Sequence, residues 1–187
     1  MTTMRMAGNV VAFQLGWFAC VLGAANGWPA FGTSAAIAIV CWHLSLATYP
    51  RPELILVIIA AVIGALWDSV LVALGWIQYP HGTLIAGVAP HWIIALWMLF
   101  ATTLNVSLGW LKRSVPIAAI FGLIGGPLAY LGGAKLDALV LLEPTFALVA
   151  QAIGWAVLTP LLLRIANRFN GFVPEPAHTL RSAGSHA

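Results

Sequence analysis

The chain has 187 residues, of which 61% are hydrophobic and only 7% are charged, and its formal net charge is +3. A soluble domain carries about 25% charged residues, so this composition excludes an ordinary soluble domain. It predicts an all-α, polytopic membrane protein, because lipid-facing helices need no charged surface. The sequence has no basic patch with interleaved aromatic residues, so the net positive charge gives no support for nucleic-acid binding.

Apolar stretches of about 17–25 residues are long enough to cross a bilayer. Taken in chain order, they predict a bundle of six transmembrane helices separated by turns that contain Pro and Gly. The expected helices cover residues 9–26, 30–48, 53–76, 91–111, 114–132 and 145–167. Two more apolar pieces, residues 82–89 and 136–142, are too short to cross the bilayer. We expect each of them at the membrane interface or as a re-entrant segment.

The basic residues predict the orientation of this bundle. Seven of the eight fall on one side of the predicted segments, namely Arg5, Arg51, Lys112, Arg113, Arg164, Arg168 and Arg181. Only Lys135 falls on the other side, so the positive-inside rule places both termini in the cytoplasm. We expect residues 1–169 to form one transmembrane domain. Residues 170–187, rich in Pro, Ser and His, are expected to be a disordered cytoplasmic tail.

Asp68 is the only acidic residue in residues 54–77, whose other members are apolar, Gly or Ser. A carboxyl group near the bilayer centre costs about 2.5–3.5 kcal/mol on insertion scales, so it normally faces the bundle interior, has a partner and has a function. The polar residues predicted at a depth from which they could approach it are Asn26, His91 and Gln151. A second polar layer, nearer the cytoplasm, is expected from Gln14, His43 and Asn105.

Four tryptophans are predicted at mid-membrane depth, and they either pack the core or form the walls of a pocket for a flat or acyl ligand. They are Trp17, Trp67, Trp97 and Trp155. Small residues line one face of the first and fifth predicted helices, including the pairs Gly23 with Gly27 and Gly122 with Gly126. Such seams let two helix backbones approach closely, within the chain or in a homodimer.

Several segments resemble an uncharacterised family of small bacterial inner-membrane proteins. The likeness is carried by residues 13–17 (FQLGW), 66–69 (LWDS), 90–92 (PHW), 96–97 (LW) and 125–130 (GGPLAY), and it covers nearly all of residues 9–169. It implies a multi-pass protein of the bacterial inner membrane and no established activity. In architecture alone, the expected bundle is also similar to the vitamin-binding subunits of energy-coupling-factor transporters and to rod-shape morphogenesis membrane proteins.

The sequence has no metalloprotease, serine-hydrolase, Walker or dinucleotide-binding motif, so we expect no metal and no cofactor and assign no catalytic residue. The favoured hypothesis is a module that binds or transports a small amphipathic molecule or a lipid in the outer half of the bundle. Its expected ligand-binding residues are Asp68, His91, Asn26, Trp67, Trp97 and Gln151. One alternative is a lipid-modifying enzyme that uses Asp68 and His91 as an acid/base pair. Another is a structural scaffold. The expected partners are the lipid bilayer, the ligand, and a membrane subunit or second copy of the chain.

Overall fold

The computed structural model describes residues 3–172, which form six α-helices, a short 3₁₀ helix and two short strands. The helices are α1 (Thr3–Ala25), α2 (Pro29–Ser45), α3 (Pro50–Ala73), α4 (His91–Leu104), α5 (Val115–Lys135) and α6 (Pro144–Arg168). The 3₁₀ helix η1 (Gly109–Arg113) lies between α4 and α5, and β1 (Ile77–Gln78) pairs antiparallel with β2 (Val140–Leu141). The prediction of a helical fold is confirmed. The predicted tail lies, from residue 173 onward, outside the described residues.

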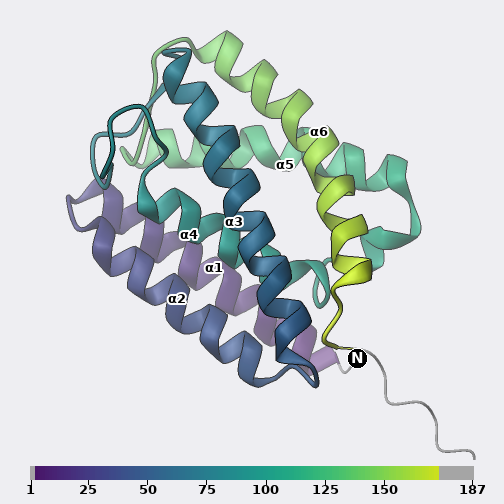
Figure 1. The fold of residues 1–187 in the computed structure, drawn as a ribbon. Helices are drawn as coiled ribbons and strands as arrows, with labels where there is room; N and C mark the ends of the chain where they lie inside the picture. Colours follow the sequence, from purple (N-terminus) through teal and green to yellow (C-terminus); the bar gives the residue numbers. More distant parts are fainter. Residues whose placement is uncertain (1–2, 173–187) are drawn as a thin grey trace, which may run out of the picture.

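Successive helices run in opposite directions, so both ends of the described chain meet at one end of the bundle (Figure 1). We call this the terminal end; it holds Thr3, the α2–α3 turn, η1 and Phe172. The opposite end, which holds the two strands, is the β end. Helices α1 and α2 form one packed pair and α5 and α6 form another, while α4 lies between them against α1, α2 and α3 (Figure 1).

Within residues 3–172, four helices are long and apolar enough to cross a membrane: α1, α3, α5 and α6. Helices α2 and α4 are also apolar, but they have only 17 and 14 residues. At 1.5 Å per residue they measure about 26 and 21 Å, less than the roughly 30 Å of a bilayer's hydrocarbon core. Six helical segments were predicted, and by length and composition four of them qualify as membrane spans.

Helix α4 ends at Leu104, seven residues before the predicted bound of 111. Polar side chains in the following turn explain the early end. Asn105 donates a hydrogen bond to the Phe169 carbonyl (3.0 Å), and Ser107 donates one to Asn9 Oδ1 (2.6 Å). These contacts hold the chain in a turn at the terminal end and prevent another helical turn.

Helix α4 is the core of the bundle, since ten of its fourteen residues are buried. The long helices around it instead expose large apolar side chains on their outer faces. Examples are Leu15 on α1, Leu66 on α3, Leu128 on α5 and Ile153 on α6. An apolar outer face of this kind is unfavourable in water and suits contact with lipid.

The two short apolar pieces are not helical. Residues 82–89 form an exposed loop at the β end, in which Leu84 is 81% exposed and the Ala89 N–H donates to Ser69 Oγ (2.9 Å). Residues 136–142 include β2, which pairs with β1. The loop and the strand pair therefore cover the β end of the bundle.

The small-residue seams pack within the chain. On α1, Cys20 lies against α2 so closely that a Cβ atom on Gly32 would be 2.4 Å from the Cys20 Cα. On α5, a Cβ atom on Gly122 would lie 2.0 Å from the Trp155 carbonyl oxygen of α6. Both separations are far below van der Waals contact. Glycine at these positions is therefore a requirement of helix packing.

Gly122→Ala is expected to lower the free energy of unfolding by about 1–3 kcal/mol, because the added methyl group must push the α6 backbone away from α5. The matched control is Gly125→Ala on the same helix, where the nearest atom to the new Cβ is 4.0 Å away. Unfolding in detergent, followed by tryptophan fluorescence, measures both variants. Equal stability of the two would contradict the tight α5–α6 contact.

Candidate functional site

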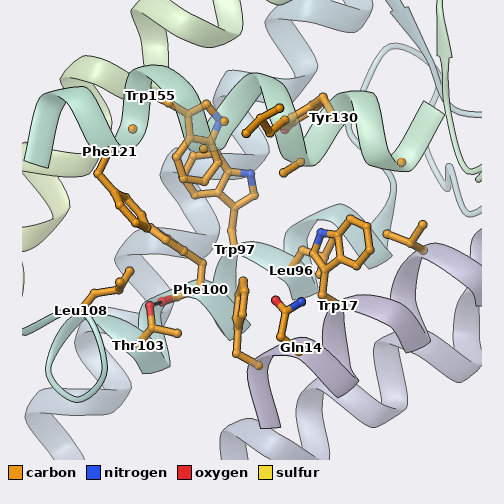
Figure 2. Close-up of a pocket in the computed structure, with 18 of the residues that line it drawn as sticks. Gln14, Trp17, Leu96, Trp97, Phe100, Thr103, Leu108, Phe121, Tyr130 and Trp155 are labelled. Atoms are coloured by element: carbon orange, nitrogen blue, oxygen red, sulfur yellow. Dashed lines mark hydrogen bonds between the residues drawn. The ribbon is translucent and has the colours of Figure 1, made fainter. Parts of the chain in front are cut away.

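A cavity of about 630 Å³ lies between α1, α4 and α5, with Trp155 of α6 in its wall (Figure 2). Its walls are apolar and rich in aromatic residues, and none of its lining residues is charged. The aromatic residues around it include Phe13, Trp17, Trp97, Phe100, Phe121 and Trp155. Of the four tryptophans predicted at mid-membrane depth, Trp17, Trp97 and Trp155 line this cavity, and Trp67 does not.

The cavity is open to the outer surface between α1 and α5, because several lining residues on these two helices are exposed. They are Val10 and Gln14 on α1 and Phe121 and Leu128 on α5. Figure 2 shows the Gln14 side chain rising from α1 into the cavity. The predicted inner layer of Gln14, His43 and Asn105 therefore does not form as a unit, since Gln14 faces the cavity instead.

Asp68 lies on α3 and is fully buried. Three donors bind its carboxylate. The hydroxyl groups of Tyr79 and Tyr130 donate to Oδ1 at 2.8 and 2.6 Å. The indole N–H of Trp97 donates to Oδ2 at 2.8 Å. The expectation that this carboxyl group faces the bundle interior with partners is met, and the partners come from the β1 region, α4 and α5.

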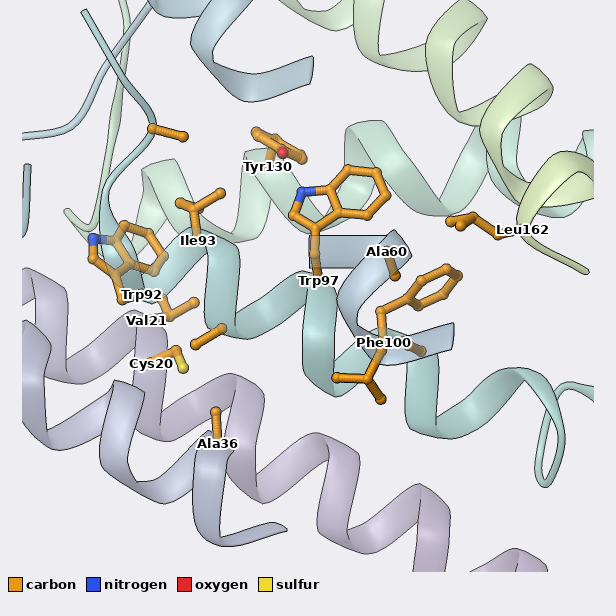
Figure 3. Packing of buried hydrophobic residues seen from close by; sticks show 14 of the residues in the cluster. Cys20, Val21, Ala36, Ala60, Trp92, Ile93, Trp97, Phe100, Tyr130 and Leu162 are labelled. Carbon is orange, nitrogen blue, oxygen red and sulfur yellow. The ribbon is translucent and has the colours of Figure 1, made fainter. Parts of the chain in front are cut away.

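Asp68 acts behind the cavity wall rather than inside the cavity. Tyr130 and Trp97 both line the cavity and both donate to Asp68, which is not itself a lining residue. Figure 3 shows the Trp97 ring pointing from α4 toward Tyr130. Because the Asp68 carboxylate accepts a hydrogen bond from each of these two wall residues, it restricts the rotation of their side chains. The structure thus joins the buried Asp68 carboxylate to the shape of the aromatic wall.

A glycine of α3 and a stacking contact with α6 also fix the position of Trp97. A Cβ atom on Gly64 of α3 would lie 1.9 Å from the Trp97 ring, so only glycine leaves room for this indole. Trp97 also stacks on Trp155, with ring centroids 4.6 Å apart and an interplanar angle of 17°. Each contact reduces the number of side-chain conformations that Trp97 can adopt. This part of the cavity wall is therefore fixed before any ligand binds.

Two other predicted site residues meet each other on the α6 side of Asp68. The Trp67 indole N–H donates to Gln151 Oε1 at 3.1 Å, and Gln151 is fully buried. Within residues 3–172, Gln151 Nε2, Trp155 Nε1 and Thr159 Oγ1 are buried without a hydrogen-bond partner. These three residues follow one another at intervals of four along α6, so they share the face that packs into the bundle.

Asn26 and His91 lie elsewhere. Asn26 is exposed and its side chain donates to the Leu22 carbonyl (2.8 Å), while His91 Nδ1 pairs with Thr33 Oγ1 (2.7 Å). In the described chain neither residue hydrogen-bonds to Asp68. Depth along the membrane normal, which is all that the sequence indicates, does not determine which way each helix faces.

A second buried carboxylate, that of Glu53, was not among the predicted site residues. Glu53 lies in the first turn of α3 at the terminal end and is fully buried. Its Oε2 pairs with His43 Nε2 at 3.0 Å, and its Oε1 accepts from Asn105 Nδ2 at 2.6 Å. Oε1 also accepts the Gly171 backbone N–H at 2.8 Å. Two members of the predicted inner layer, His43 and Asn105, therefore do converge, and Glu53 joins them.

Lys112 completes this terminal-end cluster by donating a hydrogen bond to Asn105 Oδ1. Partial burial lowers the pKa of Lys112, and the nearby Glu53 carboxylate opposes that shift. Within residues 3–172, no group of three or more His, Cys, Asp or Glu side chains is arranged to hold a metal ion. The cluster is thus a polar junction between α2, α3, the α4–α5 turn and residues 169–172.

The apolar outer faces and the four helices of membrane-spanning length define the class: a helical membrane protein with a lateral aromatic cavity. Residues 6–161 match a family described as a protein of unknown function (DUF2878), and the chain belongs to this family. The resemblance to an uncharacterised family is thereby confirmed. No curated protein and no solved structure matches the chain.

Proposed function

We propose that the protein is a multi-pass protein of the bacterial inner membrane that binds a lipophilic molecule in the cavity between α1, α4 and α5. The observation that carries this proposal is the cavity itself. Its volume of about 630 Å³ falls within the roughly 300–1,000 Å³ of ligand pockets. Its walls are apolar and aromatic, which is typical of small-molecule sites.

The membrane topology is part of the proposal. Six segments cross or enter the bilayer, and the terminal end faces the cytoplasm. The charge distribution supports this orientation, because the basic residues of the described chain other than Lys135 belong to segments of the terminal end. The short helices α2 and α4 reach the two interfaces with the help of the turns that follow them.

The lateral opening supports entry from the lipid phase. Exposed residues of α1 and α5 border the cavity. Because these two helices face lipid in this proposal, the exposed residues contact acyl chains. A ligand that is already dissolved in the bilayer reaches the cavity without crossing water. This favours a lipid or lipid-like ligand over a water-soluble one.

Asp68 has a positioning role in this proposal, because it holds Trp97 and Tyr130 in the wall. The enzyme alternative needs Asp68 and His91 within hydrogen-bond reach of each other. In the described chain Asp68 binds Tyr79, Tyr130 and Trp97. His91 pairs with Thr33 instead. The binding module is therefore the function that the geometry supports best.

Gly125→Leu tests the binding proposal, because Gly125 lines the cavity and its Cβ position is free of close contacts. The leucine side chain should occupy the cavity and lower the occupancy of a retained lipophilic molecule by about tenfold or more, since overpacking costs about 1–3 kcal/mol. Native mass spectrometry of protein released from a mild detergent measures the occupancy.

Gly8→Leu is the matched control. Gly8 lies on α1, has similar free space around its Cβ position and does not line the cavity. This variant should retain the bound molecule as the wild type does. Unchanged occupancy in Gly125→Leu, or equal losses in both variants, would contradict binding in this cavity.

A further inference from the structure

The polar groups of the cavity are few, and they are not equivalent. Thr103 Oγ1 donates to the Phe100 carbonyl at 2.6 Å, and Ser107 Oγ donates to Asn9 Oδ1 at 2.6 Å, so both hydroxyl groups are used inside the protein. The Gln14 amide has no side-chain hydrogen bond among residues 3–172, and it points into the cavity (Figure 2). The Trp155 indole N–H in the wall also has no partner within residues 3–172, but it can only donate. Gln14 is therefore the free side chain of the cavity that can both donate to and accept from a polar group of a ligand.

The cavity is a long slot rather than a round pocket. Its lining on α1 extends from Val10 to Val21, eleven residues apart, and its lining on α5 extends from Phe121 to Gly133, twelve residues apart. At 1.5 Å per residue these stretches measure roughly 17 and 18 Å. Both helices run from the terminal end to the β end, so the slot lies lengthwise along the bundle. A chain-like molecule fits such a shape better than a compact one.

Gln14 lines this slot at its open side, about 6 Å along α1 from the terminal-end limit of the slot at Val10. An amide in an apolar environment is costly unless it is hydrogen-bonded. A plain hydrocarbon chain offers it no partner. A charged group would find no counter-charge, because no lining residue is charged. The complementary group is an uncharged oxygen, which accepts from the amide N–H groups and, as a hydroxyl, also donates to the amide oxygen.

We propose that the ligand is a lipid chain that lies lengthwise in the slot and carries an uncharged oxygen function, a hydroxyl or carbonyl, which Gln14 binds. This inference rests on the proposed function and names the ligand class of the same cavity. The chain enters sideways between α1 and α5. A charged headgroup stays outside the slot at its terminal end, where Trp110 of the lining is followed by Lys112 and the exposed Arg113. Gln14 thus selects among chains by their oxygen content.

Two probes that differ by one oxygen atom test this selection: stearate, and a hydroxystearate with its hydroxyl at the middle of the chain. Each is titrated against delipidated wild-type protein and Gln14→Leu and followed by native mass spectrometry. The wild type should bind hydroxystearate about fivefold more tightly than stearate, the value of one net hydrogen bond. Gln14→Leu should bind both equally and should bind stearate at least as well as the wild type. Stearate binding also reports that the variant is folded.

The failure of this inference and the failure of the proposed function give different results. If wild-type protein binds the two chains equally, or if Gln14→Leu keeps the preference, Gln14 does not select an oxygen and the inference is wrong. Gly125→Leu would still block both chains in that case, and the binding module would stand. If neither chain binds the wild type and Gly125→Leu changes no retention, both the inference and the proposed function are wrong.

Discussion

Asp68→Leu is expected to lower the free energy of unfolding by about 3–5 kcal/mol, because three buried donors lose their acceptor and each costs about 1–3 kcal/mol. The donors are Tyr79, Tyr130 and Trp97. Two of them line the cavity, so ligand occupancy should fall in the same variant. Unfolding in detergent and native mass spectrometry measure the two effects separately.

Asp68→Asn is the informative comparison. Asparagine keeps one oxygen for the Trp97 N–H and turns its NH₂ group toward the tyrosine hydroxyl oxygens, which can accept. We expect about 1–2 kcal/mol of destabilisation, less than for leucine. Asp137→Asn is a control, because Asp137 is exposed in a turn at φ 61°, a conformation that asparagine tolerates. If Asp68→Leu were as stable as the wild type, the carboxylate would not be holding the wall.

Glu53→Ala is expected to destabilise the protein by a similar amount, about 3–5 kcal/mol, because it breaks the buried pair with His43. It also removes the acceptor of the Gly171 N–H and of the Asn105 amide. Residues 169–172 should therefore detach from the bundle before the helices unfold. Hydrogen exchange should show faster exchange at the Gly171 amide.

Glu143→Ala is the matched control for Glu53. Glu143 is an exposed glutamate next to the first turn of α6, at the β end. Its replacement should change neither the unfolding transition nor the exchange at Gly171. Slow exchange at Gly171 in Glu53→Ala would mean that the terminal-end cluster does not hold these residues.

The intramembrane acid was predictable from sequence, and its partners were not. Asp68 is conspicuous because an apolar run contains no other acid. Its donors are aromatic residues that the sequence pattern assigns to other roles. Tyr79 follows β1, beyond the end of the predicted third helix. Trp97 was predicted either to pack the core or to form the wall of a pocket, not to bind the carboxylate. Which aromatic ring reaches the carboxylate depends on helix rotation and on the course of the loops, which periodicity does not determine.

Glu53 was missed for a different reason. A charged residue at the edge of an apolar run normally marks where the helix leaves the membrane and meets water, so it served as a boundary. Residues 169–172 cover it in the folded chain and exclude water from it. His43 and Asn105 were the residues that could have indicated a buried role for Glu53. Both were expected in a polar layer near the cytoplasm, and Glu53 lies at a similar depth on a neighbouring helix.

The cavity depends on a space between α1 and α5 that no sequence pattern encodes. Tryptophans at mid-membrane depth indicate either a packed core or a pocket wall, and the distinction depends on how far apart two helices lie. Trp67 illustrates this limit. It is adjacent to Asp68 in the chain, yet it packs against Gly154 and Gln151 on α6, away from the cavity.

The short central helix has a consequence for how the protein is made. With 14 residues, α4 is too short to cross a bilayer alone. Asn105, which directly follows α4, finds its partners Glu53 and Phe169 only in the finished bundle. The longer neighbours α1 and α3 have the length and hydropathy to cross a bilayer as separate helices. Biogenesis should therefore proceed in two stages, with α4 settling into a site that the earlier-inserted helices have already built around it.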